Sequence, residues 1–72
     1  MIVVDGKDKG FVNLDNVISV EVISKDNINR LRFTEQGSAI EFEYDDSEKV
    51  NADFDSMIHG WEAGQRVFLC SN

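Results

Sequence analysis

Two turns that specify the same strand register constrain this chain more than any other feature of its sequence. A two-residue loop at Gln36-Gly37 keeps apolar residues opposite apolar residues, whereas a three-residue loop would set Arg32 against Ile40. The register pairs Phe33 with Ile40, Leu31 with Phe42, Arg32 with Glu41 and Arg30 with Glu43. A turn at Asp26-Asn27 adds the pairs Val22 with Leu31, Val20 with Phe33 and Glu21 with Arg32. Both turns therefore predict one antiparallel meander.

The two faces of this meander differ in chemistry. The apolar face comprises Val20, Val22, Leu31, Phe33, Ile40 and Phe42. On the opposite face, Arg32 lies between Glu21 and Glu41, and Arg30 faces Glu43. Exposed cross-strand pairs of this kind contribute about 0.2–1 kcal/mol each, so they specify register more than they stabilise. We expect the charged face to be exposed and largely self-neutralised.

After Tyr44 the hydrophobic period changes from that of a strand to that of a helix. The apolar residues fall on one helical stripe, which consists of Val50, Phe54, Met57, Ile58 and Trp61. Asp45, Asp46 or Ser47 can cap the start, and Gly64 is a natural stop. A strand over residues 50–54 is the alternative, because apolar and polar residues alternate there. The caps and the continuation to Trp61 favour a helix near 46–62.

The remaining segments predict short strands. Residues 1–4 and 11–13 are apolar runs bounded by glycine and asparagine turns, and residues 66–70 form a last apolar run. This last strand is either added to a sheet edge or offered to another subunit. The prediction is a single α+β domain over residues 1–72: a small antiparallel meander sheet of about five to six short strands, near 1–4, 11–13, 17–24, 30–35, 38–44 and 66–70, with one amphipathic helix packed on one face.

A chain of 72 residues can bury only a small core, so its stability should be marginal without further support. The usual supports are disulfides, a structural metal or a partner subunit. One cysteine and one histidine allow neither an internal disulfide nor a zinc cluster of those ligands. Self-association as a homodimer is the support left open. The sequence has no transmembrane run and no signal-peptide pattern, and together with its free thiol this predicts the cytoplasm, native or host, and no membrane partner.

The net charge of −7 is unevenly distributed along the chain. Residues 41–72 contain eight acids and two bases, so this half repels phosphates and anionic lipid. Direct binding to nucleic acid is therefore disfavoured. The acids crowd into one stretch, at Glu41, Glu43, Asp45, Asp46, Glu48, Asp53 and Asp55. This stretch is either a solvated face or a patch for a basic partner.

No constellation for chemistry is evident. Residues 5–16 resemble a calcium loop only faintly, because Lys7 and Lys9 occupy two ligand positions. His59 has Ser56 one helical turn away, which alone is not a catalytic pair, and we expect a structural or surface role. Cys70 reads as a small buried hydrophobe in its apolar strand. We therefore predict no catalytic, cofactor-binding or metal site.

The sequence favours a non-enzymatic protein-interaction or regulatory module, and a homodimer is the oligomeric state that it leaves open. The alternative is an acidic inhibitor that imitates nucleic-acid charge and occupies a DNA- or RNA-binding protein, as phage anti-defence proteins do. Trp61 is either core or interface, and Phe68 should point away from Val67 and Leu69 toward an interface. The candidate partner-binding residues are Asp45, Asp46, Glu48, Asp53, Asp55, Phe68 and Trp61.

Overall fold

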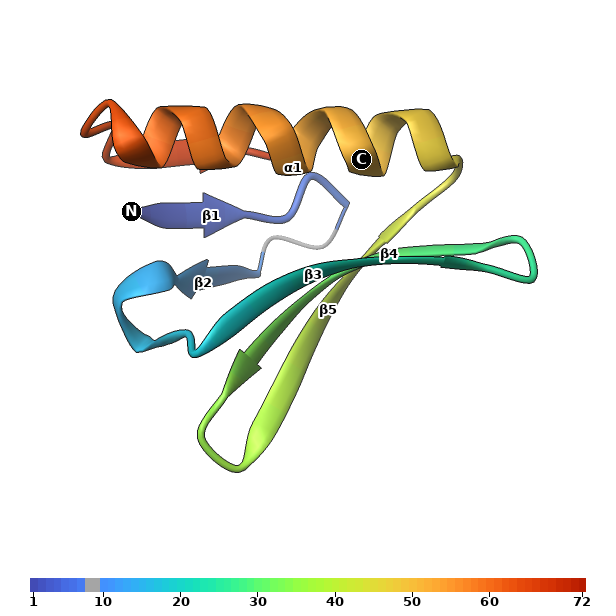
Figure 1. Cartoon of the computed structure of the whole chain (residues 1–72), viewed down its shortest axis with the longest axis horizontal. Coiled ribbons are helices and arrows are strands. Elements are labelled where there is room, and N and C mark those ends of the chain that lie inside the picture. The colour runs from blue at the N-terminus through green and yellow to red at the C-terminus, as the bar shows by residue number, and fades with distance from the viewer. Residues whose placement is uncertain (8–9) are drawn as a thin grey trace.

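The computed structural model describes residues 1–7 and 10–72, and Lys9 of the calcium-loop comparison lies outside them. The described chain folds as α+β with one α-helix and two small sheets (Figure 1). The elements are β1 (Ile2–Val4), β2 (Phe11–Asn13), the 3₁₀ turn η1 (Leu14–Asn16), β3 (Ser19–Lys25), β4 (Ile28–Glu35), β5 (Ser38–Tyr44), α1 (Ser47–Glu62) and β6 (Val67–Leu69).

The central meander has the predicted register. Strands β3, β4 and β5 form an antiparallel sheet, and every cross-strand pair derived from the two turns is confirmed. Asp26 and Asn27 both have positive φ, of 55° and 64°, as a two-residue type I′ hairpin requires. Gly37, at a φ of 82°, supplies the left-handed residue of the second turn.

Helix α1 crosses the apolar face of this sheet and contacts all three of its strands. Its start is capped by Asp46, whose side chain accepts a hydrogen bond from the Lys49 N–H at 2.8 Å. The helix includes residues 50–54, so the alternative strand there is wrong. It also continues through Gly60 to Glu62, close to the predicted end near residue 62.

The prediction of one sheet is corrected by the structure. Strands β1, β2 and β6 form a second sheet, in the order β2-β1-β6. Strand β1 pairs antiparallel with β2 and parallel with β6. The helix carries the chain back past β1, and the short turn after it lets β6 run in the same direction as β1. The last strand is therefore added to a sheet edge within the molecule.

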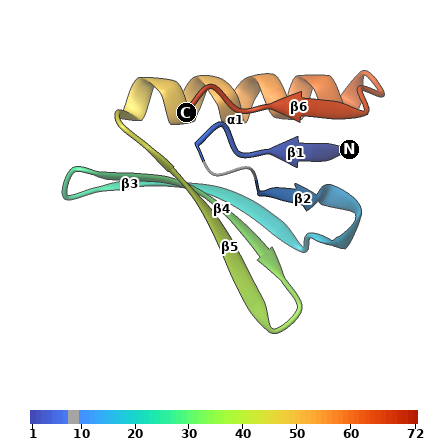
Figure 2. The ribbon, with the colours of Figure 1, turned by 180° about the vertical axis from the view of Figure 1, so that it is seen from behind.

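The core lies where the helix and the two sheets meet. Figure 2 shows β6 in front of α1 and β2 near the level of β3, with β1 between them, so the second sheet closes one side of the space under the helix. The fully buried side chains come from all three layers and include Val3, Leu31, Phe33, Val50 and Met57. Among the described residues, no helix combines the length and apolar character needed to cross a membrane.

Candidate functional site

The acidic stretch between β5 and α1 is partly occupied by structural contacts. Asp45 is exposed and its carboxylate accepts a hydrogen bond from Lys7 Nζ at 3.1 Å. Asp46 caps the helix, as described above, while Glu48 and Asp55 are exposed on α1. The cap at Asp46 is one of those the sequence predicts, and Glu48 and Asp55 keep the exposure expected of a solvated or partner-binding face.

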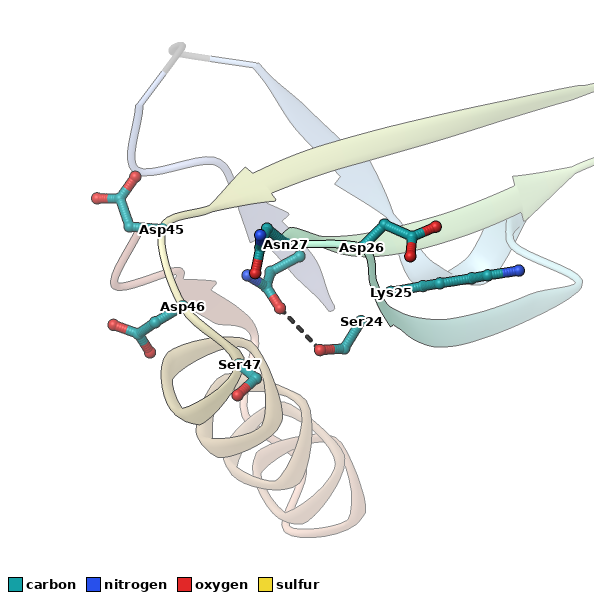
Figure 3. Close-up of a pocket in the computed structure, with 8 residues that line it drawn as sticks. Ser24, Lys25, Asp26, Asn27, Asp45, Asp46 and Ser47 are labelled. Carbon is teal, nitrogen blue, oxygen red and sulfur yellow. Dashed lines mark hydrogen bonds between the residues drawn. The ribbon is translucent and has the colours of Figure 1, made fainter.

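A shallow polar hollow lies between this segment and the β3–β4 turn, and Figure 3 shows its lining. Ser24 Oγ donates a hydrogen bond to Asn29 Oδ1 at 2.7 Å. The carboxylates of Asp45 and Asp46 point away from Asp26 in this view, so the three acids do not converge on one point. Among residues 1–7 and 10–72, no group of three or more His, Cys, Asp or Glu side chains could hold a metal ion.

Asp53 belongs to the interior, which differs from its expected place in a partner-binding surface. It is buried and accepts three hydrogen bonds: from the Tyr44 hydroxyl at 2.6 Å, from the Ser71 N–H at 2.7 Å and from Ser71 Oγ at 3.0 Å. The helical spacing carries a signal for this, because Asp53 lies three residues after Val50 and four before Met57, on the buried side of α1. A buried carboxylate is stable only with such partners.

The charged face of the central sheet is self-neutralised, with one change of partner. Glu41 accepts hydrogen bonds from Arg32 Nε and from Arg30 Nη1, each at 2.8 Å, so Arg30 reaches diagonally past Glu43. Arg32 also approaches Glu21 at 3.5 Å. The hydrogen bond from Arg32, followed by that from Arg30, lowers the pKa of the Glu41 carboxyl despite an opposing effect of burial. Glu41 is thus unsuited to imitate a free phosphate.

Cys70, one of the groups considered for chemistry, lies in an environment that does not activate its thiol. Cys70 is buried, and burial raises the pKa of its thiol to about 11 although the Tyr44 hydroxyl opposes the shift. Burial and the hydrogen bond to Asp53 also raise the pKa of the Tyr44 hydroxyl. The Cys70 thiol is therefore neutral at physiological pH, and a neutral thiol is a poor nucleophile. His59 is exposed on α1.

Side chains of β6 alternate between the two faces of the sheet as expected, but the face predicted to be exposed is the one that packs against the core. Phe68 is half-buried and packs against the core, while Val67 and Leu69 are 47% and 70% exposed. The cause is the pairing with β1, because Phe68 lies opposite the fully buried Val3. The exposed apolar atoms of this strand therefore belong to Val67 and Leu69.

Trp61 borders an apolar hollow between α1 and the start of β3. The side chain is 48% exposed, and Ile18, 71% exposed, lies at the same hollow. The cavity has a volume of about 180 Å³ and is lined by Leu14, Val17, Ile18, Ser19, Val20, Ile58 and Trp61. Sequence reasoning identified Trp61 but missed Ile18, because Ile18 falls in the strand predicted near 17–24, where alternation with Val20 and Val22 puts it on the apolar face. In the structure β3 begins only at Ser19, and Ile18 in the preceding bend is exposed.

Comparison of the chain with protein-family models, with curated proteins and with solved structures finds no match. The Ile18–Trp61 hollow is both concave and lined mainly by apolar side chains.

Proposed function

We propose that the protein is a non-enzymatic interaction module that binds another protein through the Ile18–Trp61 hollow. The observation that carries this proposal is the half-exposed Trp61 beside the exposed Ile18, at the rim of an apolar cavity. Tryptophan is enriched among the residues that contribute most to protein–protein affinity, particularly next to a pocket that a partner can fill.

The size of the cavity favours a side chain over a cofactor or metabolite. Small-molecule sites usually have volumes of about 300–1,000 Å³ and several converging polar groups. The hollow is smaller, at about 180 Å³, and of its lining residues only Ser19 and Trp61 carry a polar side-chain group. An aliphatic or aromatic side chain from a partner protein is the occupant that suits this volume and polarity.

Two acids that are sequence neighbours of the lining residues suggest the charge of the partner's surface. Asp15 follows the lining residue Leu14 and Glu62 follows Trp61, and both acids are exposed. The whole chain carries a net charge of −7. A partner with lysine or arginine beside its apolar anchor would be complementary to this rim, which raises the association rate and makes it dependent on salt.

Trp61 is the single tryptophan of the chain, so its fluorescence reports directly on the hollow. The experiment selects binders from a library of tryptophan-free peptides and then titrates each into the purified protein while Trp61 emission is recorded. We expect peptides with an apolar anchor flanked by basic residues, and a blue shift of the emission as the anchor excludes water from the indole.

The matched variants are Ile18→Lys at the hollow and Ile28→Lys at the β3–β4 turn, where Ile28 is 46% exposed. Both add the same charge to an exposed isoleucine, so binding should weaken by about tenfold or more only in the first. Binders that leave Trp61 emission unchanged and bind Ile18→Lys equally well would contradict the proposal. If such binding disappeared at high salt, it would instead support the acidic nucleic-acid mimic.

A further inference from the structure

The outer face of the β2-β1-β6 sheet is apolar and uncovered. The register directs Val3, Val12 and Phe68 to the core, and the intervening residues therefore point outward. The outward set is Ile2, Val4, Phe11, Asn13, Val67 and Leu69. Phe11 is 63% exposed and Leu69 is 70% exposed, and Figure 2 shows no other helix or strand of the described residues in front of these strands.

This face is neutral in a strongly acidic molecule. None of its six residues is charged, and residues 63–72, which include β6, contain no acid and one arginine. By contrast, both edge strands of the central sheet carry glutamates, among them Glu21 on β3 and Glu43 on β5. Two copies of a chain with a net charge of −7 repel each other least where the apposed surfaces carry no charge.

We propose that this face is the interface of a homodimer in which two copies stack their β2-β1-β6 sheets face to face. The two-fold axis runs along β1, so that Val4 meets the partner's Val4. Strand β2 then lies over the partner's β6, and Phe11 packs on the partner's Leu69. Both copies make the same contact, as an isologous interface requires.

The register favours this axis over the alternative. A two-fold axis perpendicular to the strands would set Phe11 against the polar Asn13 of the second copy and leave Leu69 against the smaller Val67. The axis along β1 instead buries the two most exposed side chains of the face against each other. Both axes keep the strands of the two sheets nearly aligned, which is the common geometry of stacked sheets, so the side-chain pairing decides between them.

The extent of the face predicts a weak dimer. Stable interfaces bury about 800 Å² per partner. Three strands of three residues cover a rectangle of roughly 14 by 10 Å, from a strand spacing of about 4.8 Å and a rise of about 3.3 Å per residue. This footprint is much smaller than that of a stable interface, so we expect a weak dimer, with a dissociation constant of about 10 μM to 1 mM.

Sedimentation equilibrium over this concentration range measures the association. The variant Leu69→Lys should weaken the dimer by about tenfold or more, and Ile28→Lys, which adds the same charge to an exposed apolar residue elsewhere, should leave it unchanged. Added salt should strengthen the wild-type dimer, because it screens the repulsion between acidic copies. A wild-type protein that is monomeric at about 1 mM, or a dimer that Leu69→Lys leaves intact, would overturn the proposal.

Disulfide cross-linking tests the axis itself. In a Cys70→Ala background, Phe11→Cys and Leu69→Cys proteins should form a mixed disulfide when combined under oxidising conditions, because the two positions meet across the interface. Each protein alone should cross-link several-fold less, since neither position meets itself. A dimer in which the mixture cross-links no better than the separate proteins would contradict this arrangement. This interface is independent of the Ile18–Trp61 hollow, so failure of either proposal leaves the other standing.

Discussion

The hydroxyl of Tyr44 donates a 2.6 Å hydrogen bond to the carboxylate of Asp53, and this contact joins the end of β5 to the middle of α1. Ser71 adds its N–H and its hydroxyl to the same carboxylate, so three segments far apart in sequence meet at one buried charge. Tyr44 is the last residue of β5, and Ser71 lies two residues after the end of β6. The cluster therefore fixes how the helix and both sheets come together.

We predict that Tyr44→Phe lowers the free energy of unfolding by about 1–2 kcal/mol, because the buried carboxylate loses a hydrogen-bond donor. Asp53→Ala should lower it by more, since two donors of Ser71 and the tyrosine hydroxyl would lose their acceptor together. Urea unfolding measures both values. Asp55→Ala is the control, because Asp55 is exposed on the same helix and should change stability by less than about 0.5 kcal/mol. Equal stability of Tyr44→Phe and wild type would show that the contact contributes nothing.

Replacing Gly6 should also destabilise the protein, because Gly6 lies against the chain that follows β6. A Cβ atom at this position would lie 2.6 Å from the Cys70 carbonyl oxygen and 2.9 Å from Asn72 Oδ1. The first of these is a backbone atom, so Gly6→Ala must displace the chain after β6. We expect a loss of about 1–3 kcal/mol in the free energy of unfolding.

The control for this change is Gly10→Ala, because a Cβ at Gly10 meets no atom of the described residues within 4 Å. Thermal unfolding of the two variants gives the comparison, and we expect the melting temperature to fall only in Gly6→Ala. The lower backbone entropy of an unfolded alanine variant raises stability and so cannot cause a fall. A fall of equal size in both variants would therefore show that the approach of Cys70 is not the cause.

The structural features that the sequence predicts correctly are those that depend on local patterns. The pairing of β3, β4 and β5 follows from two short turns and from the cost of placing an arginine among apolar side chains, and the structure confirms each pair. Helix α1 follows from its apolar period and from the cap at Asp46. These inferences involve residues close in sequence, where few alternatives compete.

The second sheet could not be inferred in this way, because β1 and β6 are separated by most of the chain. Each of these strands has three residues, too few for alternation to specify a partner or a direction. The side of β6 that faces the core depends on its contact with β1, which explains why Phe68 was placed outward. The burial of Asp53 was missed for a related reason, because the acids around it suggested a common exposed surface.

The turn between β3 and β4 provides a test of the left-handed backbone at Asn27. A type I′ turn favours glycine at its second central position, and Asn27 has a φ of 64°. We predict that Asn27→Gly is neutral or stabilises the protein by up to about 1 kcal/mol, whereas Asn27→Ala destabilises it by about 1 kcal/mol. Urea unfolding of both variants gives the order, and an alanine variant as stable as the glycine variant would contradict the turn assignment.

The buried thiol of Cys70 makes stability dependent on pH on the alkaline side. Burial raises its pKa in the folded protein to about 11, so this contribution is fully present below the ordinary thiol pKa and is lost as pH rises toward 11. In that window the unfolded chain ionises its thiol while the folded protein keeps it neutral. We expect the free energy of unfolding to fall by about 2 kcal/mol across it. Cys70→Ala should remove this part of the slope and leave the part due to Tyr44, whose pKa is also raised.

Labelling with a thiol reagent at neutral pH should be slow in the folded protein and fast in urea. Rapid labelling of the folded protein, or an unchanged alkaline slope in Cys70→Ala, would contradict the burial of this thiol.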